Sequence, residues 1–159
     1  MGRIDKENYY LDIAQTVAER STCLRRRYGA ILVKSDEIIA TGYNGAPRGR
    51  QNCVDLNYCT REALNIPSGE RYELCRSVHA EANAIISAAR SEAIGATLYM
   101  ACVNPTTGEL IPHSTSCSMC RRLIINAGIQ RVVIRDTKTN YSVVQVEDWI
   151  QEDDSLPQH

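Results

Sequence analysis

A histidine, a glutamate and two cysteines are the residues of this chain whose types and spacing could do chemistry. His79 and Glu81 stand in a His-Ala-Glu sequence, and Cys117 and Cys120 in a Cys-Ser-Met-Cys sequence. An imidazole and two thiolates provide three ligands for a tetrahedral Zn²⁺ and leave the fourth position to water, whereas a structural zinc is closed by four ligands. We therefore expect a catalytic zinc held by His79, Cys117 and Cys120, with Glu81 free to move the proton of the water.

The combination of the two motifs makes this interpretation specific. A Cys-x-x-Cys pair alone is common, and a His-x-Glu sequence alone carries little information. Taken singly, His79 could be a core or surface histidine, and Glu81 an acid favoured by the dipole at a helix N-terminus. Together they form the signature of zinc-dependent nucleobase deaminases, in which hydroxide attacks an electrophilic ring carbon. In such a site Glu81 would also protonate the ring nitrogen and help the amine depart.

Two predicted helices must position these residues. Residues 79–90 carry apolar side chains at helical spacing, and residues 117–127 end before Gly128, which is a stop signal. Cys117 and Cys120 are three residues apart and share one helix face. In a first turn, side chains lean toward the helix N-terminus, so His79 and Glu81 can both reach a site there. The partial positive charge of a helix N-terminus also favours a thiolate over a thiol.

The remaining pattern predicts an α/β fold in a single domain over residues 1–159. We expect a first helix over residues 5–20, a short helix near 59–64, and strands at residues 29–33, 38–41, 96–103, 131–135 and 141–146. This order predicts a mixed, about five-stranded sheet with helices on both faces, a three-layer α/β/α sandwich. Residues 45–78 form a loop-rich insertion, and residues 104–116 a turn-rich one. Ligands of such sheets bind beyond the strand ends.

Composition sets further bounds. The chain has 43% hydrophobic and 23% charged residues and a net charge of −1, which argues against a protein that coats nucleic acid. No apolar run approaches the roughly 20 residues that cross a membrane, and the N-terminal sequence lacks a signal-peptide core, so we expect a cytoplasmic protein. The seven cysteines are then interpreted as thiols or metal ligands rather than disulfides.

Five motifs give the chain a family resemblance over nearly its whole length. They are Tyr-Gly-Ala-Ile-Leu-Val at 28–33, Thr-Gly-Tyr-Asn-Gly-Ala-Pro at 41–47, His-Ala-Glu-Ala-Asn-Ala-Ile at 79–85, Gly-Ala-Thr-Leu-Tyr at 95–99 and Cys-Ser-Met-Cys at 117–120. With them the chain resembles the deoxycytidylate (dCMP) deaminases of the cytidine deaminase superfamily. The Gly-Tyr-Asn-Gly loop is the feature that separates dCMP deaminases from free-nucleoside and transfer-RNA deaminases.

The resemblance implies a cytidine deaminase-like fold and a zinc-dependent hydrolysis of dCMP to dUMP and ammonia, which supplies thymidylate synthesis. It also implies activation by dCTP, inhibition by dTTP and a homohexamer. One position departs from the family, which usually has proline before the first zinc cysteine, where this chain has Ser116. Serine is a good helix N-cap, so we expect the site to survive, with the loop before Ser116 altering access or assembly.

Two residues are candidates for contacts with the nucleoside. Asn44 matches the superfamily's asparagine at the end of the second strand, which contacts the sugar. Because Asn beside Gly is also a common turn residue, a purely structural role stays open for Asn44. Tyr141, after the last main strand, is a further candidate to approach the active site.

Arginines are the candidates for the phosphate, because the planar guanidinium can bind two oxygens at once. Arg25, Arg26 and Arg27 directly precede the first predicted strand, and we expect at least one of them to bind phosphate. Arg48 and Arg50 are the next candidates, and any of these side chains could instead serve a regulatory nucleotide. Alternatively, these arginines could simply lie on a solvent-exposed surface and bind no ligand.

The resemblance also raises a second zinc. Cys23 and Cys53 match positions at which some relatives bind a second, structural zinc, and Cys59 and Cys75 could complete a set of four thiolates. A metal would order an insertion that has few apolar residues. The alternative is that these cysteines are small buried apolar residues, which is also the expected role of Cys102.

Three other functions remain open from the sequence. The enzyme could deaminate another cytosine nucleotide, such as CMP or dCTP, or a base within a nucleic acid, for which a long basic surface would be expected. The third function is a non-enzymatic binding or regulatory module. The presence of Glu81 argues against it, because a purely structural zinc site does not require that acid. Activity on dCMP, CMP, deoxycytidine and an oligonucleotide separates these functions.

Overall fold

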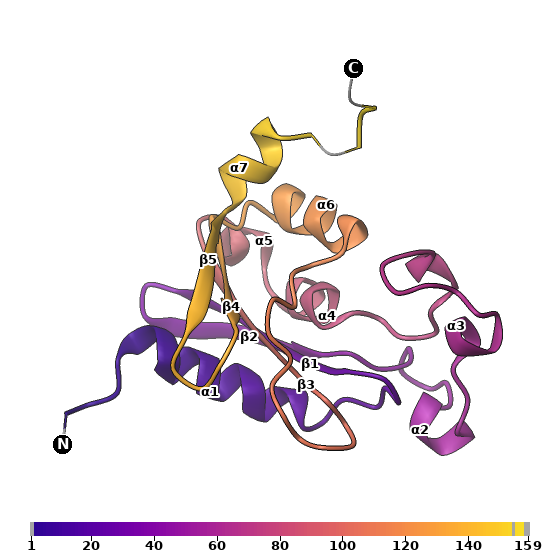
Figure 1. The fold of residues 1–159 in the computed structure, drawn as a ribbon. Coiled ribbons are helices and arrows are strands. Elements are labelled where there is room, and N and C mark those ends of the chain that lie inside the picture. The colour runs from indigo at the N-terminus through magenta and orange to yellow at the C-terminus, as the bar shows by residue number, and fades with distance from the viewer. Residues whose placement is uncertain (1, 154, 158–159) are drawn as a thin grey trace.

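A five-stranded mixed sheet is the centre of the molecule (Figure 1). The structure is a computed structural model that describes residues 2–153 and 155–157. The strand order is β2-β1-β3-β4-β5, with β3 and β4 parallel and the other neighbours antiparallel. The strands are β1 (Arg27–Lys34), β2 (Glu37–Tyr43), β3 (Thr97–Val103), β4 (Arg131–Arg135) and β5 (Tyr141–Gln145). The predicted mixed sheet is confirmed.

Helices cover both faces of this sheet. Helix α1 (Lys6–Ala18) packs on one face against β1 and β3, and its N-cap Asp5 accepts a hydrogen bond from the Asn8 N–H. The other face carries α4 (Ala80–Ser87), α5 (Arg90–Ala93) and α6 (Ser118–Ala127), with α7 (Val146–Gln151) against α6. The predicted three-layer α/β/α sandwich is therefore confirmed.

Each face of the sheet has its own apolar core. Leu11 of α1 is buried together with Ile31 and Val133 of the sheet. Met100 and Ile124 belong to the larger cluster between the sheet and α4 and α6. Strand β3 is buried over nearly its whole length because it lies in the middle of the sheet with a helix layer on either side. This rigid centre holds the N-termini of α4 and α6 in place.

Two glycines allow helices to approach the sheet closely. A Cβ atom at Gly29 would lie 2.0 Å from the backbone oxygen of Ala14 in α1. A Cβ atom at Gly42 would lie 2.4 Å from the Ala80 oxygen and 2.4 Å from the Ala84 nitrogen in α4. Both glycines are needed because backbone meets backbone there, leaving no room for a side chain.

The predicted insertion over residues 45–78 leaves and rejoins the fold at one point. Gly45 and Val78 exchange two backbone hydrogen bonds, 3.2 and 2.7 Å long. Between them lie only short helices, α2 (Cys53–Leu56), α3 (Thr60–Ala63) and η1 (Tyr72–Leu74). The short helix expected near residues 59–64 is thus present, and α2 was not predicted.

One helix and one strand end earlier than the sequence-based expectation. The helix expected over residues 79–90 ends at Ser87, since Ala88 is extended at φ −101° and ψ 148°, and α5 follows separately. This break lets Ala93 turn into the core, where it is 3% exposed. The last strand ends at Gln145, and α7 continues from Val146 because Trp149 packs against the apolar cluster under α6.

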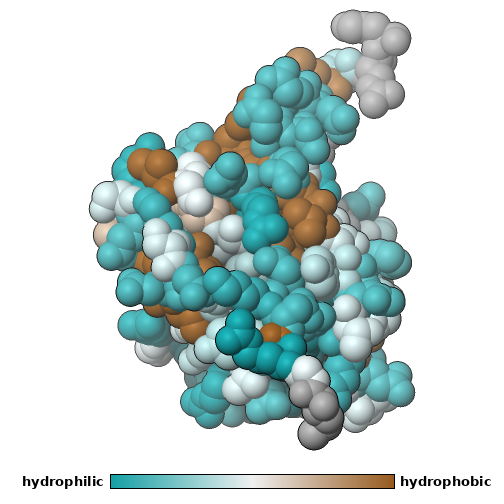
Figure 2. Space-filling model, turned by 90° about the vertical axis from the view of Figure 1, so that its left-hand side faces the viewer, coloured by the Kyte–Doolittle hydropathy of each residue, from teal (hydrophilic) through white to brown (hydrophobic). Residues whose placement is uncertain are grey.

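The face of the molecule drawn in Figure 2 is mostly polar. Figure 2 shows one face on which hydrophilic residues dominate and hydrophobic residues form several separate patches. No helix of the described residues combines the length and apolar character needed to cross a membrane.

Candidate active site

Three candidate metal ligands meet where α4 and α6 begin. His79 is the N-cap of α4, Cys117 is the N-cap of α6, and Cys120 lies in the first turn of α6. The Nδ1 atom of His79 lies 3.5 Å from the Cys117 Sγ and 3.4 Å from the Cys120 Sγ. All three ligand atoms lie within 4.8 Å of one another. The two motifs are thus brought together as the sequence predicted.

These distances fit a tetrahedral zinc. With zinc–nitrogen and zinc–sulfur bonds of roughly 2.0 and 2.3 Å, tetrahedral ligands lie about 3.3–3.8 Å apart. The two distances to His79 fall within that range. Among the described residues, these three form the one group of histidine, cysteine and acidic side chains compact enough to hold a metal ion. Three ligands leave a fourth position for water, as in catalytic zinc sites.

The protonation of the cluster also suits a metal. A hydrogen bond with Cys120 lowers the pKa of the Cys117 thiol to about 4. The same contact, followed by burial, raises the pKa of the Cys120 thiol. Hydrogen bonds with Cys117 and then Cys75 raise the pKa of His79 to about 10. Zinc binds thiolate and neutral imidazole and so takes the place of the protons that these groups hold without metal.

Glu81 lies beside this cluster and is not one of its three ligands. It stands in the first turn of α4 and is 4% exposed. After the contact with Cys117 and burial, the nearby charge of the Glu81 carboxylate contributes to raising the pKa of Cys120, so the two side chains lie close together. Glu81 also lines the cavity in front of the ligands. A buried carboxylate at this position can exchange a proton with a water or substrate held there.

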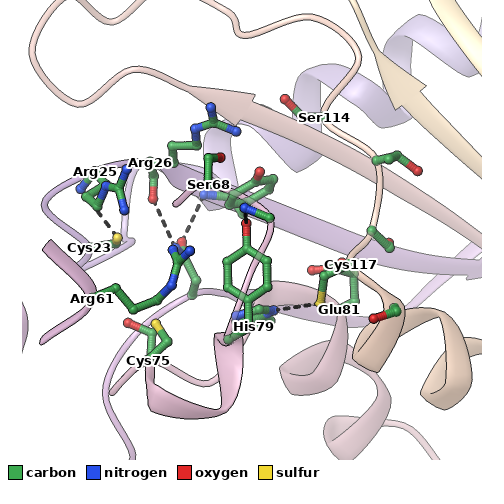
Figure 3. A pocket seen from close by; sticks show the side chains of 18 of the residues that line it. Cys23, Arg25, Arg26, Arg61, Ser68, Cys75, His79, Glu81, Ser114 and Cys117 are labelled. Atoms are coloured by element: carbon green, nitrogen blue, oxygen red, sulfur yellow. Dashed lines mark hydrogen bonds between the residues drawn. The ribbon is translucent and has the colours of Figure 1, made fainter. Parts of the chain in front are cut away.

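A cavity of about 330 Å³ opens in front of the ligands (Figure 3). Its wall combines the chain leading into β1, the end of β2, the insertion, the start of α4 and the segment leading into α6. The lining residues are Cys23, Arg25, Arg26, Tyr28, Asn44, Cys59, Arg61, Ser68, Gly69, Tyr72, Cys75, Ser77, His79, Glu81, His113, Ser114, Thr115, Ser116, Cys117 and Ser118. Beyond its catalytic end, the cavity is therefore built largely from irregular segments.

Asn44 lies in the cavity wall and its side chain braces the chain around it. Its Oδ1 accepts hydrogen bonds from the Tyr28 N–H, at 2.9 Å, and from the Ser21 hydroxyl. Its Nδ2 donates to the Arg26 carbonyl at 2.9 Å. These bonds show a structural role and leave one amide hydrogen of Asn44 without a partner among the described residues. A sugar contact through that hydrogen stays a prediction.

The structure separates the arginine candidates. Arg25 and Arg26 line the cavity, whereas Arg27, Arg48 and Arg50 do not. Arg27 belongs to β1, and Arg48 and Arg50 are exposed on the loop after β2. The phosphate prediction therefore narrows to Arg25 and Arg26.

Tyr141 begins β5 at the edge of the sheet, where it pairs with Arg135, and it does not line the cavity. Because β5 is the edge strand beyond β4, the Tyr141 side chain is not among the residues around the candidate metal ligands. Within the described chain, the structure does not bring Tyr141 to the site.

Sequence reasoning missed Arg61, Ser68 and Tyr72 as lining residues. All three come from the insertion, whose lack of apolar periodicity hid which side chains turn inward. The Tyr72 ring packs edge-on against the His79 ring, with centroids 5.4 Å apart. Tyr28 also lines the cavity and lies within a family motif, which was the one signal that could have found it.

Four of the remaining cysteines gather near the cavity without forming a closed metal site. Cys23, Cys59 and Cys75 line the cavity. Burial first, and then the neighbouring thiols of all three, raise the pKa of the buried Cys53. No three of these thiols come within 4.8 Å of one another among the described residues. Cys102 is fully buried in β3, in keeping with a packing role, and burial raises the pKa of its thiol to about 11.

The expectation for Ser116 is wrong in one respect. Cys117, not Ser116, is the N-cap of α6. Ser116 is 3% exposed and its hydroxyl has no hydrogen-bond partner among the described residues, while its carbonyl accepts a bond from Arg121 at 3.0 Å. Residues 113–116 line the cavity, so the loop before the first zinc cysteine does border the access to the site.

Comparisons with known proteins agree with this geometry. Residues 4–136 match the model of the cytidine and deoxycytidylate deaminase zinc-binding region. A deoxycytidylate deaminase of Mycobacterium phage D29 is 40% identical over 138 residues, which span 84% of this chain and 96% of the phage protein. A deoxycytidylate deaminase of Schizosaccharomyces pombe is 35% identical over 80% of this chain, which covers 36% of that longer protein.

A solved structure is also similar. The dCMP deaminase of cyanophage S-TIM5 in complex with dCMP and dUMP superposes with a TM-score of 0.55 and 26% identity, covering 85% of each chain. The family match spans both ligand motifs and most of the fold that positions them. The chain therefore belongs to the zinc-binding cytidine and deoxycytidylate deaminase family.

Proposed function

We propose that this protein hydrolyses dCMP to dUMP and ammonia and so supplies dUMP for thymidylate synthesis. The observation that carries the proposal is the convergence of His79, Cys117 and Cys120 beside the buried Glu81, at one end of a cavity that also has arginines in its wall. Relatives at 35–40% identity are deoxycytidylate deaminases, and a similar solved enzyme holds dCMP and dUMP, which supports this substrate.

The chemistry follows from the positions of the side chains. When bound at the three ligands, zinc supplies a Lewis acid that lowers the pKa of water toward about 7. Glu81 accepts a proton as water adds to C4 of cytosine, and it passes that proton to ring nitrogen N3. It then carries the proton of the new hydroxyl to the amino group. The C4–N4 bond breaks, ammonia leaves, and the C4 carbonyl of uracil forms.

Glu81→Gln tests this assignment. We expect the variant to keep its zinc and its fold while kcat falls by about 10²–10⁴, because a positioned acid–base group contributes that much. Zinc content by metal analysis and ammonia release from dCMP are the measurements. A fully active Glu81→Gln enzyme, or one that has lost its zinc, would contradict the role. Assays with CMP, dCTP, deoxycytidine and a short oligonucleotide decide between dCMP and the other cytosine substrates.

A second, structural zinc held by Cys23, Cys53, Cys59 and Cys75 stays a proposal. What supports it is the gathering of four thiols at one side of the insertion, close enough to raise the pKa of Cys53. Binding would require these side chains to move closer together, because none of the described triplets is yet compact. Metal analysis of the purified protein gives two zinc ions per chain if the proposal is correct, and one rules it out.

Regulation and assembly are proposed from the resemblance. We propose activation by dCTP and inhibition by dTTP, with exposed Arg48 and Arg50 available to a regulatory nucleotide. A homohexamer is supported by exposed apolar side chains on the α4–α6 layer, including Ile86 at 74% and Leu123 at 45%. Rates measured against dCMP concentration with and without each effector test the regulation, and unchanged curves refute it. Light scattering tests the assembly, and a monomer refutes the homohexamer.

We also propose a cytoplasmic location. All seven cysteines are free thiols in the structure, and two of them are candidate zinc ligands that must stay reduced to bind metal. Cell fractionation tests the location.

A further inference from the structure

Arg61 is a buried arginine in a segment that is otherwise exposed. It belongs to α3 in the insertion and is 6% exposed, whereas most of its neighbours along the chain are exposed. Its Nε and Nη2 donate hydrogen bonds to the Glu70 carbonyl, at 3.2 and 2.9 Å, and Nη2 donates to the Pro67 carbonyl at 2.9 Å. Its Cζ lies 4.2 Å from the centre of the Tyr72 ring. All of these partners are uncharged.

The positive charge of Arg61 therefore has no counter-ion within the described part of the chain. The adjacent Glu62 carboxylate pairs instead with Arg25, whose Nε lies 3.2 Å from its Oε1. The recorded hydrogen bonds use Nε and Nη2 of Arg61 and leave Nη1 without a partner among the described residues. A buried charge is costly unless it is paired. This arrangement therefore points to an anion that comes from outside the chain.

The position of Arg61 in the cavity indicates which anion fits. Figure 3 shows its side chain extending into the cavity on the side of Arg25, Arg26 and Ser68, opposite to Glu81 and Cys117 in that view. A nucleotide carries its base and its phosphate at opposite ends. With cytosine at Glu81, the phosphate would lie toward the arginine side of the same cavity.

We infer that Arg61 binds the 5′-phosphate of the substrate and makes the enzyme prefer nucleotides to nucleosides. This inference rests on the proposed function, because it takes a cytosine nucleotide as the substrate. The guanidinium is held from one side by two carbonyls and the Tyr72 ring, which leaves Nη1 to the phosphate oxygens. Arg26, which is exposed and lines the cavity, is placed to share the charge of the phosphate.

A purely structural role for Arg61 makes a different prediction. Its bonds to residues 67 and 70 hold the loop that leads to Tyr72, and Tyr72 contacts the zinc ligand His79. If that were its whole role, loss of Arg61 would lower zinc content and would affect nucleotide and nucleoside substrates equally. Phosphate binding instead predicts a loss confined to substrates that carry a phosphate.

Arg61→Gln is the test, with Arg71→Gln as the matched control. Arg71 lies ten positions further in the same insertion, is exposed, pairs with Glu73 and does not line the cavity. We expect kcat/KM for dCMP to fall about 10- to 100-fold in Arg61→Gln, the usual effect of losing a hydrogen bond between charged groups. Activity on deoxycytidine and zinc content should stay unchanged, and Arg71→Gln should match the native enzyme.

Two further measurements keep the inference testable if Arg61→Gln folds poorly. Arg61→Lys keeps the charge and loses the planar fork, so its preference for dCMP over deoxycytidine should lie between the native and Gln values. Inorganic phosphate should inhibit dCMP deamination competitively, with an inhibition constant that rises as the preference falls. Equal losses on both substrates, or an unchanged preference in Arg61→Lys together with unchanged inhibition by phosphate, overturn the inference. A native enzyme inactive on every cytosine nucleotide refutes the proposed function instead.

Discussion

Gly42→Ala tests whether the close approach of α4 to β2 sets the geometry of the active site. The new Cβ would lie 2.4 Å from the Ala80 oxygen and from the Ala84 nitrogen, whereas ordinary contact begins at 3.4 Å. Both atoms belong to the backbone, so no rotamer change relieves the clash, and α4 must withdraw by about 1 Å. Ala80 directly follows the candidate zinc ligand His79 and precedes Glu81. The displacement is therefore passed directly to the candidate zinc ligand and to the proposed acid–base group of that helix.

The expected cost has a stability part and a catalytic part. Overpacking of this kind costs about 1–3 kcal/mol, which lowers the Tm by roughly 2–12 °C in a domain of this size. A misplacement of about 1 Å at catalytic groups can lower the rate about 10²-fold. Calorimetry, zinc analysis and kcat/KM of the folded variant measure these effects.

Gly29→Ala is the matched control for this prediction. Its Cβ would meet the Ala14 oxygen of α1 at 2.0 Å, a clash at least as severe on the opposite face of the sheet. It should lower the Tm and leave kcat/KM per bound zinc nearly unchanged. If Gly42→Ala keeps full activity, or if both variants lose activity alike, the position of α4 does not control the site.

Three more outcomes follow from the structure. The zinc affinity of the metal-free protein, measured with a competing chelator, should rise as the pH rises toward about 10. Because the pKa values of His79 and Cys120 are raised, both groups hold protons at neutral pH that zinc must displace. A zinc affinity that does not change with pH contradicts this. Ile124→Ala, at a fully buried side chain, should cost about 2–5 kcal/mol of unfolding free energy, and Leu64→Ala, at a side chain 57% exposed, should cost less than about 1 kcal/mol. Ser116→Ala removes a buried hydroxyl without a partner and should leave the unfolding free energy unchanged or raise it by up to about 1 kcal/mol, so a clear loss in denaturant melts would show that the hydroxyl is bonded.

The regular elements and the meeting of His79, Cys117 and Cys120 were predictable from the sequence. Hydrophobic periodicity marks the strands and the long helices because one side of each element must face the core. The motifs at His79 and Cys117 each stand at a predicted helix start, and packing of α4 against α6 then leaves little freedom in where they meet. The site's catalytic half is thus encoded locally, in two short segments.

The side chains that the insertion adds to the cavity could not be predicted, because irregular contacts within the insertion, and no periodic pattern, turn them inward. Arg61 turns inward because carbonyls at residues 67 and 70 and the Tyr72 ring surround it, and no local pattern announces those contacts. Asn44 shows a different difficulty. Its position in the family motif indicated a contact with the sugar, whereas the hydrogen bonds of its side chain in the structure hold β1 and the segment before it. Residue type alone does not separate these two roles.

The insertion links the two ends of the cavity covalently. It contributes Arg61 and Tyr72 to the wall and closes at the Gly45–Val78 bridge, one residue before the zinc ligand His79. A phosphate bound at Arg61 would therefore order the segment that leads into the metal site and holds Tyr72 against His79. The binding energy of the phosphate can then lower the activation barrier for the reaction at C4 of cytosine. For that reason deoxycytidine, which lacks the phosphate, should show a lower kcat as well as a higher KM. An equal kcat for dCMP and deoxycytidine would mean that the phosphate contributes to binding alone.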